Sequence, residues 1–112
     1  MVAAAPERGE LVWLGFSPQA GHEQAGRRPA LVVSPASYNS RSGLALVCPV
    51  TTKSKGYPFD VHIPEGLPVC GVIQSDQLRS LDWKERKASF IARVSEDTLQ
   101  SVLDKIRPLL GL

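Results

Sequence analysis

The stretch EQAGRRPALVVS, residues 23–34, begins as a loop and ends as a strand, and the rest of the chain is arranged around it. Gly26 frees the loop backbone, whereas Pro29 fixes its own φ angle and favours an extended conformation for Arg28. The apolar, β-branched run that follows is typical of a buried strand. We therefore expect Arg28 where a loop meets a rigid sheet. There its guanidinium could hold a ligand or pair with a carboxylate beside the sheet.

Size and composition indicate one domain with an ordinary hydrophobic core. The chain has 112 residues, a hydrophobic fraction of 43% and a formal net charge of +2. No apolar run is long enough to span a membrane, and the N-terminus lacks the apolar segment of a signal peptide, so we expect a cytoplasmic protein without a membrane partner. Two cysteines, Cys48 and Cys70, are too few for a disulfide framework, and Cys48 lies in an apolar run that favours burial.

The positive charges are unevenly spread along the chain. Residues 24–59 contain no Asp or Glu, but they contain Arg27, Arg28, Arg41, Lys53 and Lys55. If these side chains gather on one face, they make a field for a polyanion; the alternative is an ordinary solvated surface. A second basic group over residues 79–87 is diluted by two carboxylates, which favours the solvated reading there.

The remaining pattern predicts short strands closed by one helix. We expect strands over residues 10–16, 28–34, 44–50, 59–63, 70–74 and 88–94, and helical turns near Pro35 and over residues 80–86. Ser95 suits the N-cap of a helix with one apolar stripe, and Pro108 should end that helix at Arg107. The sequence therefore predicts a mainly β domain over residues 1–112, a twisted antiparallel sheet or small barrel with a C-terminal helix.

Two polar loops adjoin the predicted strands. One ends in Arg28 and the other opens with Thr51. If the two strands are antiparallel neighbours, Arg28 and Thr51 meet at one end of the sheet, where a guanidinium beside a hydroxyl suits a phosphate. The sequence has no cluster of His, Cys, Asp and Glu at ligand spacing, so we expect no metal and no other cofactor.

Three ordered motifs resemble those of the MazF/PemK toxins. They are EQAGRRPALVVSP at residues 23–35, PVTTKSKGYPF at residues 49–59 and SDQLRSLDW at residues 75–83. The resemblance implies an SH3-like barrel of the CcdB/PemK type that works as a homodimer. It also implies a sequence-specific mRNA interferase, the toxin of a toxin–antitoxin pair. Such enzymes cut single-stranded RNA without a metal, leave a 2′,3′-cyclic phosphate and a 5′-hydroxyl, and are blocked by an antitoxin with an acidic disordered tail.

By the same resemblance, the catalytic residues of the family fall on Arg28 and Thr51. Arg28 suits the stabilisation of charge on a phosphorane, but a guanidinium keeps its proton in proteins, which makes arginine a poor general base. Glu23, inside the first motif, or His22 could take that role. For RNA contacts by stacking and hydrogen bonding we expect Phe16, Gln24, Arg27, Lys53, Ser54, Lys55 and Gln77, although Phe16 also suits a core position.

Other readings of the chain stay open. Gly15 and Ser17 stand where members of the family often carry acidic residues, so the sequence does not give the RNA target. Gyrase-binding toxins of the CcdB type share the barrel and cleave nothing, and a nucleic-acid-binding barrel without chemistry is a third possibility. Arg28, Thr51 and the basic second loop favour the nuclease, because a gyrase binder needs none of them.

Overall fold

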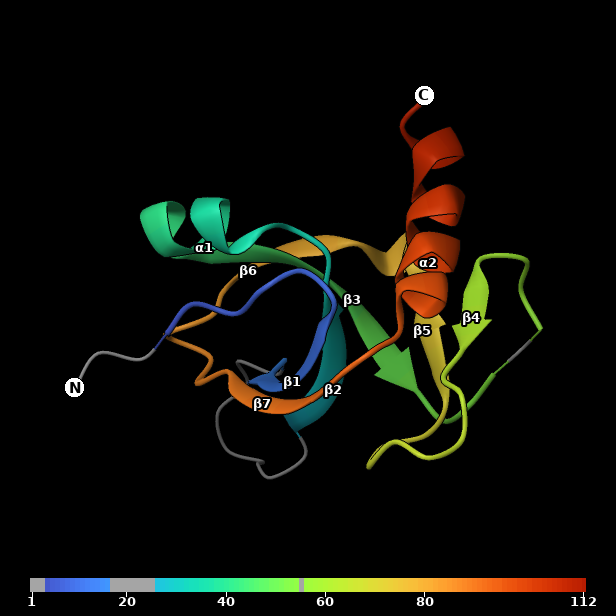
Figure 1. The fold of residues 1–112 in the computed structure, drawn as a ribbon, viewed down its shortest axis with the longest axis horizontal. Helices are drawn as coiled ribbons and strands as arrows, with labels where there is room; N and C mark the ends of the chain where they lie inside the picture. Colours follow the sequence, from blue (N-terminus) through green and yellow to red (C-terminus); the bar gives the residue numbers. More distant parts are fainter. Residues whose placement is uncertain (1–3, 17–25, 55) are drawn as a thin grey trace.

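The computed structural model describes residues 4–16, 26–54 and 56–112, which form a twisted antiparallel sheet with two α-helices (Figure 1). Along the chain the elements are β1 (Glu10–Gly15), β2 (Arg27–Val32), α1 (Ala36–Ser42), β3 (Leu44–Thr51), β4 (Asp60–His62), β5 (Val72–Gln74), the 3₁₀ turn η2 (Ser75–Gln77), β6 (Arg79–Asp82), β7 (Ser89–Arg93) and α2 (Glu96–Leu109). The strand order is β4-β5-β3-β2-β1-β7, and β6 pairs with β3 beside this path. The predicted mainly β fold with a C-terminal helix is confirmed.

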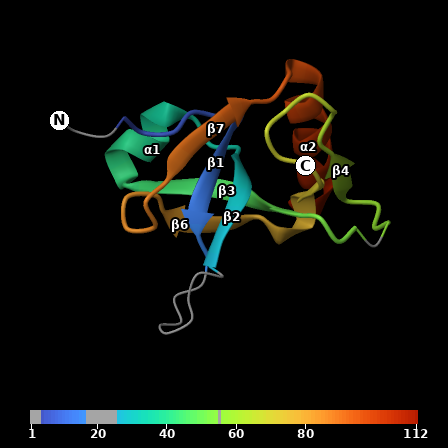
Figure 2. The same cartoon turned by 90° about the horizontal axis from the view of Figure 1, so that it is seen from below.

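β3 joins the two parts of the sheet. Its first half, Leu44–Val47, pairs with β6, and its middle, Val47–Pro49, pairs with β2 on the opposite edge. Its last two residues pair with β5. Its side chains alternate between the two faces of the sheet, so that Ala45 and Val47 enter one core while Cys48 and Val50 enter the other. Seen from below, β3 crosses the molecule between α1 and α2 (Figure 2).

Two apolar cores stabilise the fold. One lies between the sheet and α2 and includes Leu11, Leu31, Cys48, Ile73, Leu99, Val102 and Ile106. The other includes Val12, Leu14, Ala30, Val32, Val47, Leu81 and Trp83. In the second core, the indole Nε1 of Trp83 donates a hydrogen bond of 2.8 Å to the carbonyl of Asn39 in α1. Because β1 contributes to both cores, nearly every one of its residues is apolar, as its sequence indicates.

The C-terminal helix α2 starts at the predicted place and ends later than predicted. Ser95 Oγ accepts a hydrogen bond of 3.2 Å from the backbone N–H of Thr98, as an N-cap does. The predicted end at Arg107 is wrong, because Pro108 lies inside the last turn and the helix continues to Leu109. The N–H of Leu110 still bonds to the carbonyl of Arg107 at 3.0 Å, so the turn closes without the missing proline N–H. No helix in the described part of the chain has the length and apolar character to cross a membrane.

Residues 79–82 are a strand, which corrects the predicted helical turn over residues 80–86. β6 pairs Leu81 with Ala45 of β3. Leu81 and Trp83 are buried while Ser80 and Asp82 are exposed, which is the two-residue period of a strand. The turn comes only after this strand. The single helical turn expected near Pro35 is the longer helix α1. The other strands lie within two residues of their predicted bounds.

Candidate active site

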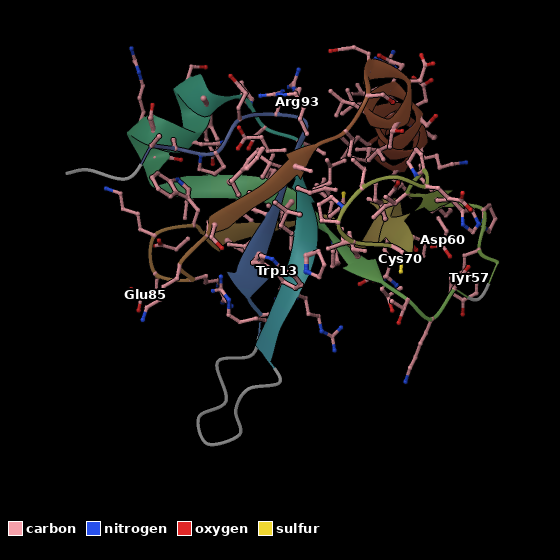
Figure 3. The ribbon with its side chains drawn as sticks, turned by 60° about the horizontal axis from the view of Figure 1, so that its bottom comes forward. Trp13, Tyr57, Asp60, Cys70, Glu85 and Arg93 are labelled. Carbon is pink, nitrogen blue, oxygen red and sulfur yellow. The ribbon has the colours of Figure 1, made fainter. Side chains whose placement is uncertain are left out.

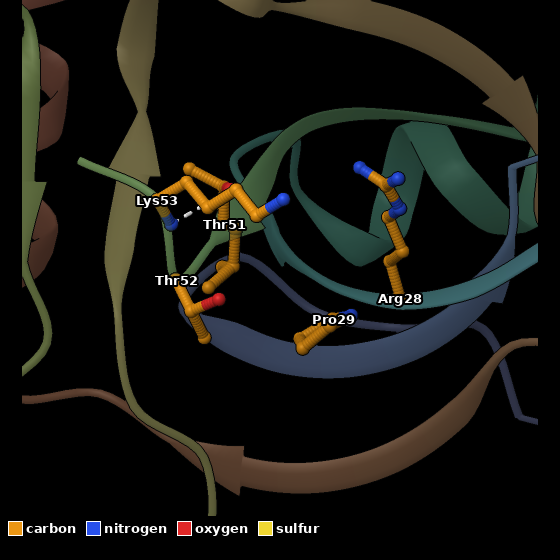
Figure 4. A pocket seen from close by; sticks show the side chains of 6 residues that line it. Arg28, Pro29, Thr51, Thr52 and Lys53 are labelled. Atoms are coloured by element: carbon orange, nitrogen blue, oxygen red, sulfur yellow. Dashed lines mark hydrogen bonds between the residues drawn. The ribbon is translucent and has the colours of Figure 1, made fainter. Parts of the chain in front are cut away.

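An open depression of about 330 Å³ lies where β2 begins and β3 ends. Its lining residues are Arg28, Pro29, Val50, Thr51, Thr52 and Lys53, and none of them is acidic. The antiparallel register Ala30↔Pro49 and Leu31↔Cys48, continued toward the strand ends, sets Arg28 opposite Thr51. In the close-up, the Arg28 side chain stands across from the segment Thr51–Lys53, with Pro29 between them (Figure 4). The structure thus brings the two expected residues into one depression, which is open to an anion.

The backbone of Arg28 is paired within the sheet, whereas its guanidinium is accessible to solvent. It lies in β2 opposite Leu14 of β1, and its side chain is exposed. Within the described residues, no hydrogen bond or ion pair involves its side chain, so the pairing with a carboxylate beside the sheet is absent there. A fork of N–H donors at the rim of an open depression is suited to the oxygens of a phosphate.

The hydroxyl of Thr51 has a fixed orientation. Its Oγ1 accepts a hydrogen bond of 3.1 Å from the backbone N–H of Lys53 (dashed line in Figure 4). Because one lone pair of the hydroxyl is used by this bond, its proton is left to donate to another acceptor. Thr51 is half-buried at the end of β3, so the backbone beneath it is part of the sheet.

The second loop is held by Ser54. The Ser54 hydroxyl donates to Asp60 Oδ2 at 3.5 Å and accepts the N–H of Gly56 at 3.2 Å. This hydroxyl, which we expect to contact RNA, already has two partners within the protein. Lys53 is exposed at the depression. Asp60 and Tyr57 lie at the end of the molecule opposite Glu85 (Figure 3).

Arg27 has surroundings quite unlike those of its neighbour Arg28. Its guanidinium donates hydrogen bonds to the carbonyl of Arg86 at 3.1 Å, to the carbonyl of Lys87 at 3.0 Å and to Ser89 Oγ at 3.2 Å. Arg86 in turn donates to the carbonyl of Gly15 at 2.8 Å. We call this set of bonds between residues 15, 27 and 86–89 the arginine clasp. The RNA-contact prediction for Arg27 has no support from this geometry, because its donors face the turn before β7.

Phe16 and Gln77 differ in their exposure. Phe16 is half-buried against the core that contains Val12 and Trp83, and the Arg79 guanidinium stands 5.4 Å from the centre of its ring. This cation–π contact occupies one face of the ring, so stacking of a base there competes with Arg79. Gln77 is exposed at the end of η2. Arg79 lies inside the third motif, but its contact with Phe16 links residues 63 positions apart and has no local sequence signal.

Some predicted site residues lie outside the described residues. They are Glu23 and its alternative His22, together with Gln24 and Lys55. Their roles therefore stay predictions. Among the described residues no group of three or more His, Cys, Asp and Glu side chains is placed to hold a metal ion, and His62 is exposed on β4.

Comparison with known proteins identifies the family. Residues 7–110 match the family of PemK-like, MazF-like toxins of type II toxin–antitoxin systems. The chain belongs to this family. The endoribonuclease toxin MazF of Escherichia coli strain K12 is 44% identical over 106 residues, which cover 95% of each chain. The Escherichia coli endoribonuclease PemK is 36% identical over 109 residues, which cover 93% of this chain and 81% of PemK.

Solved structures of the PemK-like, MazF-like family have the same fold. MazF from Deinococcus radiodurans superposes with a TM-score of 0.88 at 55% identity, over 96% of this chain and 98% of that one. A MazE–MazF structure from the same organism gives a TM-score of 0.90 at 52% identity, with the same coverage of both chains. The small barrel of the CcdB/PemK type expected from the motifs is thus confirmed as the fold class.

Proposed function

We propose that this chain, a MazF-type endoribonuclease toxin of a toxin–antitoxin system, cleaves single-stranded mRNA at specific sequences and without a metal. In the reaction, the 2′-oxygen attacks the neighbouring phosphorus and the bond from phosphorus to the 5′-oxygen breaks. The products carry a 2′,3′-cyclic phosphate and a 5′-hydroxyl. The observation that carries the proposal is that Arg28 and Thr51 line one depression, and none of the described residues in its lining is acidic.

Charge stabilisation is the main demand of this reaction. The nucleophile belongs to the substrate, so the protein needs no activated water, but the phosphorane oxygens gain negative charge as the 2′-oxygen attacks. The Arg28 guanidinium could donate two hydrogen bonds to those oxygens. The Thr51 hydroxyl, whose Oγ1 already accepts the Lys53 N–H, could donate its proton to the same group.

Two proton transfers complete the balance of the reaction. The 2′-hydroxyl must lose a proton and the leaving 5′-oxygen must gain one. Arg28 is unsuited to accept a proton because its guanidinium stays charged. We propose Glu23 as the base, on the strength of its place in the first motif. The leaving 5′-oxygen takes its proton from solvent water.

Recognition of RNA would come from side chains around the depression. Lys53 is exposed beside Thr51, and Gln77 is exposed on η2. Gln24 and Lys55, which belong to the two loops, complete the proposed contacts to bases and phosphates. Ser54 and Arg27 have partners within the protein, so we give them the role of holding the loops.

The partners of the chain follow from the same function. An active nuclease in the cytoplasm needs a block, and a MazE–MazF structure of Deinococcus radiodurans is among the similar folds. We propose an antitoxin whose acidic disordered tail covers the basic depression. We also propose a homodimer, because Phe90 on the edge strand β7 is 63% exposed, and a second copy could cover this apolar side chain. The gyrase-binding alternative receives no support, since the similar named proteins are endoribonucleases.

A single 2′-deoxy substitution tests the chemistry. A single-stranded RNA is cut by the protein in the presence of EDTA, and the cut sites are mapped. The same RNA is then made with one deoxynucleotide immediately 5′ of the scissile phosphate. We expect cleavage to stop at that site and to continue at other sites. Cleavage at the deoxy position, or loss of all cleavage with EDTA, would contradict the mechanism.

A further inference from the structure

We propose that Gly71 is a positioning residue for Thr51, because it lets two backbone segments meet where a side chain would push them apart. The inference rests on the proposed function, since the position of Thr51 matters only if its hydroxyl serves the scissile phosphate. Gly71 directly precedes β5, and β5 pairs with the end of β3 that carries Thr51.

The contact between Gly71 and Thr51 leaves no room for a Cβ atom. A Cβ on Gly71 would overlap the carbonyl oxygen of Thr51 and would stand 3.0 Å from its carbonyl carbon and 3.3 Å from Thr52 Cα. These are backbone atoms, which cannot rotate away as the end of a long side chain can. Gly71 also has a φ of +125°, a conformation that L-residues rarely adopt.

The strand β5, which follows Gly71, is also held by β4 on the edge that faces away from β3. The carbonyl of Gly71 accepts the N–H of Ile63 at 3.0 Å. The next two residues, Val72 and Ile73, are 1% and 0% exposed and pair with β3 on one edge and with β4 on the other. A methyl group added to Gly71 would therefore displace the Thr51–Thr52 backbone rather than β5.

Such a displacement would change the candidate active site. β3 lies between β5 and β2, so movement of Thr51 away from Gly71 is movement relative to Arg28. The side chain would follow the backbone, because Oγ1 is bonded to the N–H of Lys53 two residues on. Misplacement of a reacting group by about 1 Å can cost a hundredfold in rate. Gly71 would thus set the position of the Thr51 hydroxyl from the start of the neighbouring strand, β5.

The substitution Gly71→Ala tests this role, and Gly66→Ala is its matched control. Gly66 also has a positive φ, +104°, but a Cβ there meets no heavy atom within 4 Å. In both variants an alanine must adopt a positive φ, which strains the backbone. Only in Gly71→Ala does the added Cβ also collide with Thr51. For cleavage of a single-stranded RNA we expect kcat to fall at least about tenfold in Gly71→Ala, with KM within about twofold of wild type. Gly66→Ala should keep the wild-type kcat, and equal kcat values in the two folded variants would overturn the proposal.

A double-mutant cycle separates positioning from general damage. In the background of Thr51→Val, Gly71→Ala should slow cleavage little further, because the hydroxyl that it displaces is already gone. If the two substitutions reduce the cleavage rate by factors that simply multiply, their effects are independent, and the proposal is overturned. Wild-type activity of Thr51→Val would instead contradict the role of Thr51 in the proposed function. If Thr51→Val is slow while Gly71→Ala is fully active, the positioning role of Gly71 is overturned and the proposed function stands.

If Gly71→Ala does not fold, a chemically synthesised protein with D-alanine in place of Gly71 tests the same role. D-alanine at position 71 accepts a positive φ, and its methyl replaces the other α-hydrogen, not the one directed at Thr51. We expect the D-alanine protein to fold and to cleave RNA with the wild-type kcat. A folded D-alanine protein with a kcat at least about tenfold lower would overturn the role assigned to the Thr51 contact.

Discussion

The two arginines that open β2 follow each other in sequence and have different surroundings. Successive side chains of a strand point to opposite faces. Arg27 donates to residues 86–89, whereas Arg28 lines the depression with Thr51. The sequence predicts that Arg28 meets Thr51 at one end of the sheet. It does not tell which arginine is already bonded within the protein, because that depends on the turn before β7, some 60 residues further along the chain.

The hydroxyl of Thr51 can be tested by restoring it on a smaller side chain. Thr51→Val keeps the shape of the side chain and removes the hydroxyl, and we expect RNA cleavage to slow at least about tenfold. Thr51→Ser keeps the hydroxyl and should retain most of the activity. The measurement is the single-turnover cleavage rate of both variants. Equal rates for Thr51→Val and Thr51→Ser would exclude a role for the hydroxyl.

The Cys48 thiol gives a prediction about pH. Cys48 is 0% exposed in the core beneath α2, and burial, aided by the nearby charge of Asp76, raises the pKa of its thiol from 9.0 to about 12. Above pH 9 the unfolded chain loses this proton while the folded chain keeps it, so the free energy of unfolding falls as pH rises. The loss should approach about 1.4 kcal/mol for each pH unit above 9.

The variant Cys48→Ala isolates the contribution of the Cys48 thiol to the pH dependence of stability. The variant creates a small cavity, which lowers stability by an amount that does not depend on pH. Cys70 and the other titrating groups remain in both proteins. Urea unfolding between pH 8 and 11 should therefore show the difference between wild type and Cys48→Ala shrinking above pH 9. A constant difference across that range would mean that the thiol keeps its ordinary pKa.

At the scale of elements, β6 shows why part of the fold escapes prediction. Residues 80–86 contain no β-branched residue and end in a polar run, which favours a helical turn when they are read locally. Their strand conformation comes from β3, which pairs Leu44–Val47 with Arg79–Asp82. By contrast, α2 is predicted almost to its bounds, because its cap and its apolar stripe are local features.

The arginine clasp connects β1, β2 and the turn before β7, and we expect it to stabilise the sheet. Arg27→Ala removes three donors to two carbonyls and a hydroxyl. Because the bonds are exposed, the expected loss in the free energy of unfolding is modest, about 1–2 kcal/mol. Urea denaturation measures it. Lys87→Ala is the control, since it also removes one positive charge but leaves the Lys87 carbonyl in place. Equal free energies of unfolding for the two variants would contradict a stabilising role of the arginine clasp.

For the whole molecule, charge distribution matters more than net charge. The net charge is only +2, yet the described lining of the depression has Arg28 and Lys53 and no carboxylate. Binding of RNA should therefore release counterions and weaken as salt rises. With an RNA that carries 2′-deoxy at the scissile position, the logarithm of affinity should fall linearly with the logarithm of salt concentration. Lys53→Ala should reduce that slope by about one, and Arg41→Ala, on α1, should leave it unchanged. Equal slopes for the two variants would place Lys53 away from the RNA phosphates.

The most direct test of the account is the cleavage of a single-stranded RNA by Arg28→Ala, in EDTA, with mass spectrometry of the fragment ends. Arg41→Ala removes the same charge from an exposed position on α1 and is the matched control. We predict that wild type and Arg41→Ala yield 2′,3′-cyclic phosphate and 5′-hydroxyl ends. Arg28→Ala should cut at least about a hundredfold more slowly while its circular dichroism spectrum is unchanged. Wild-type cleavage by Arg28→Ala, or fragments with 5′-phosphate ends, would contradict the account.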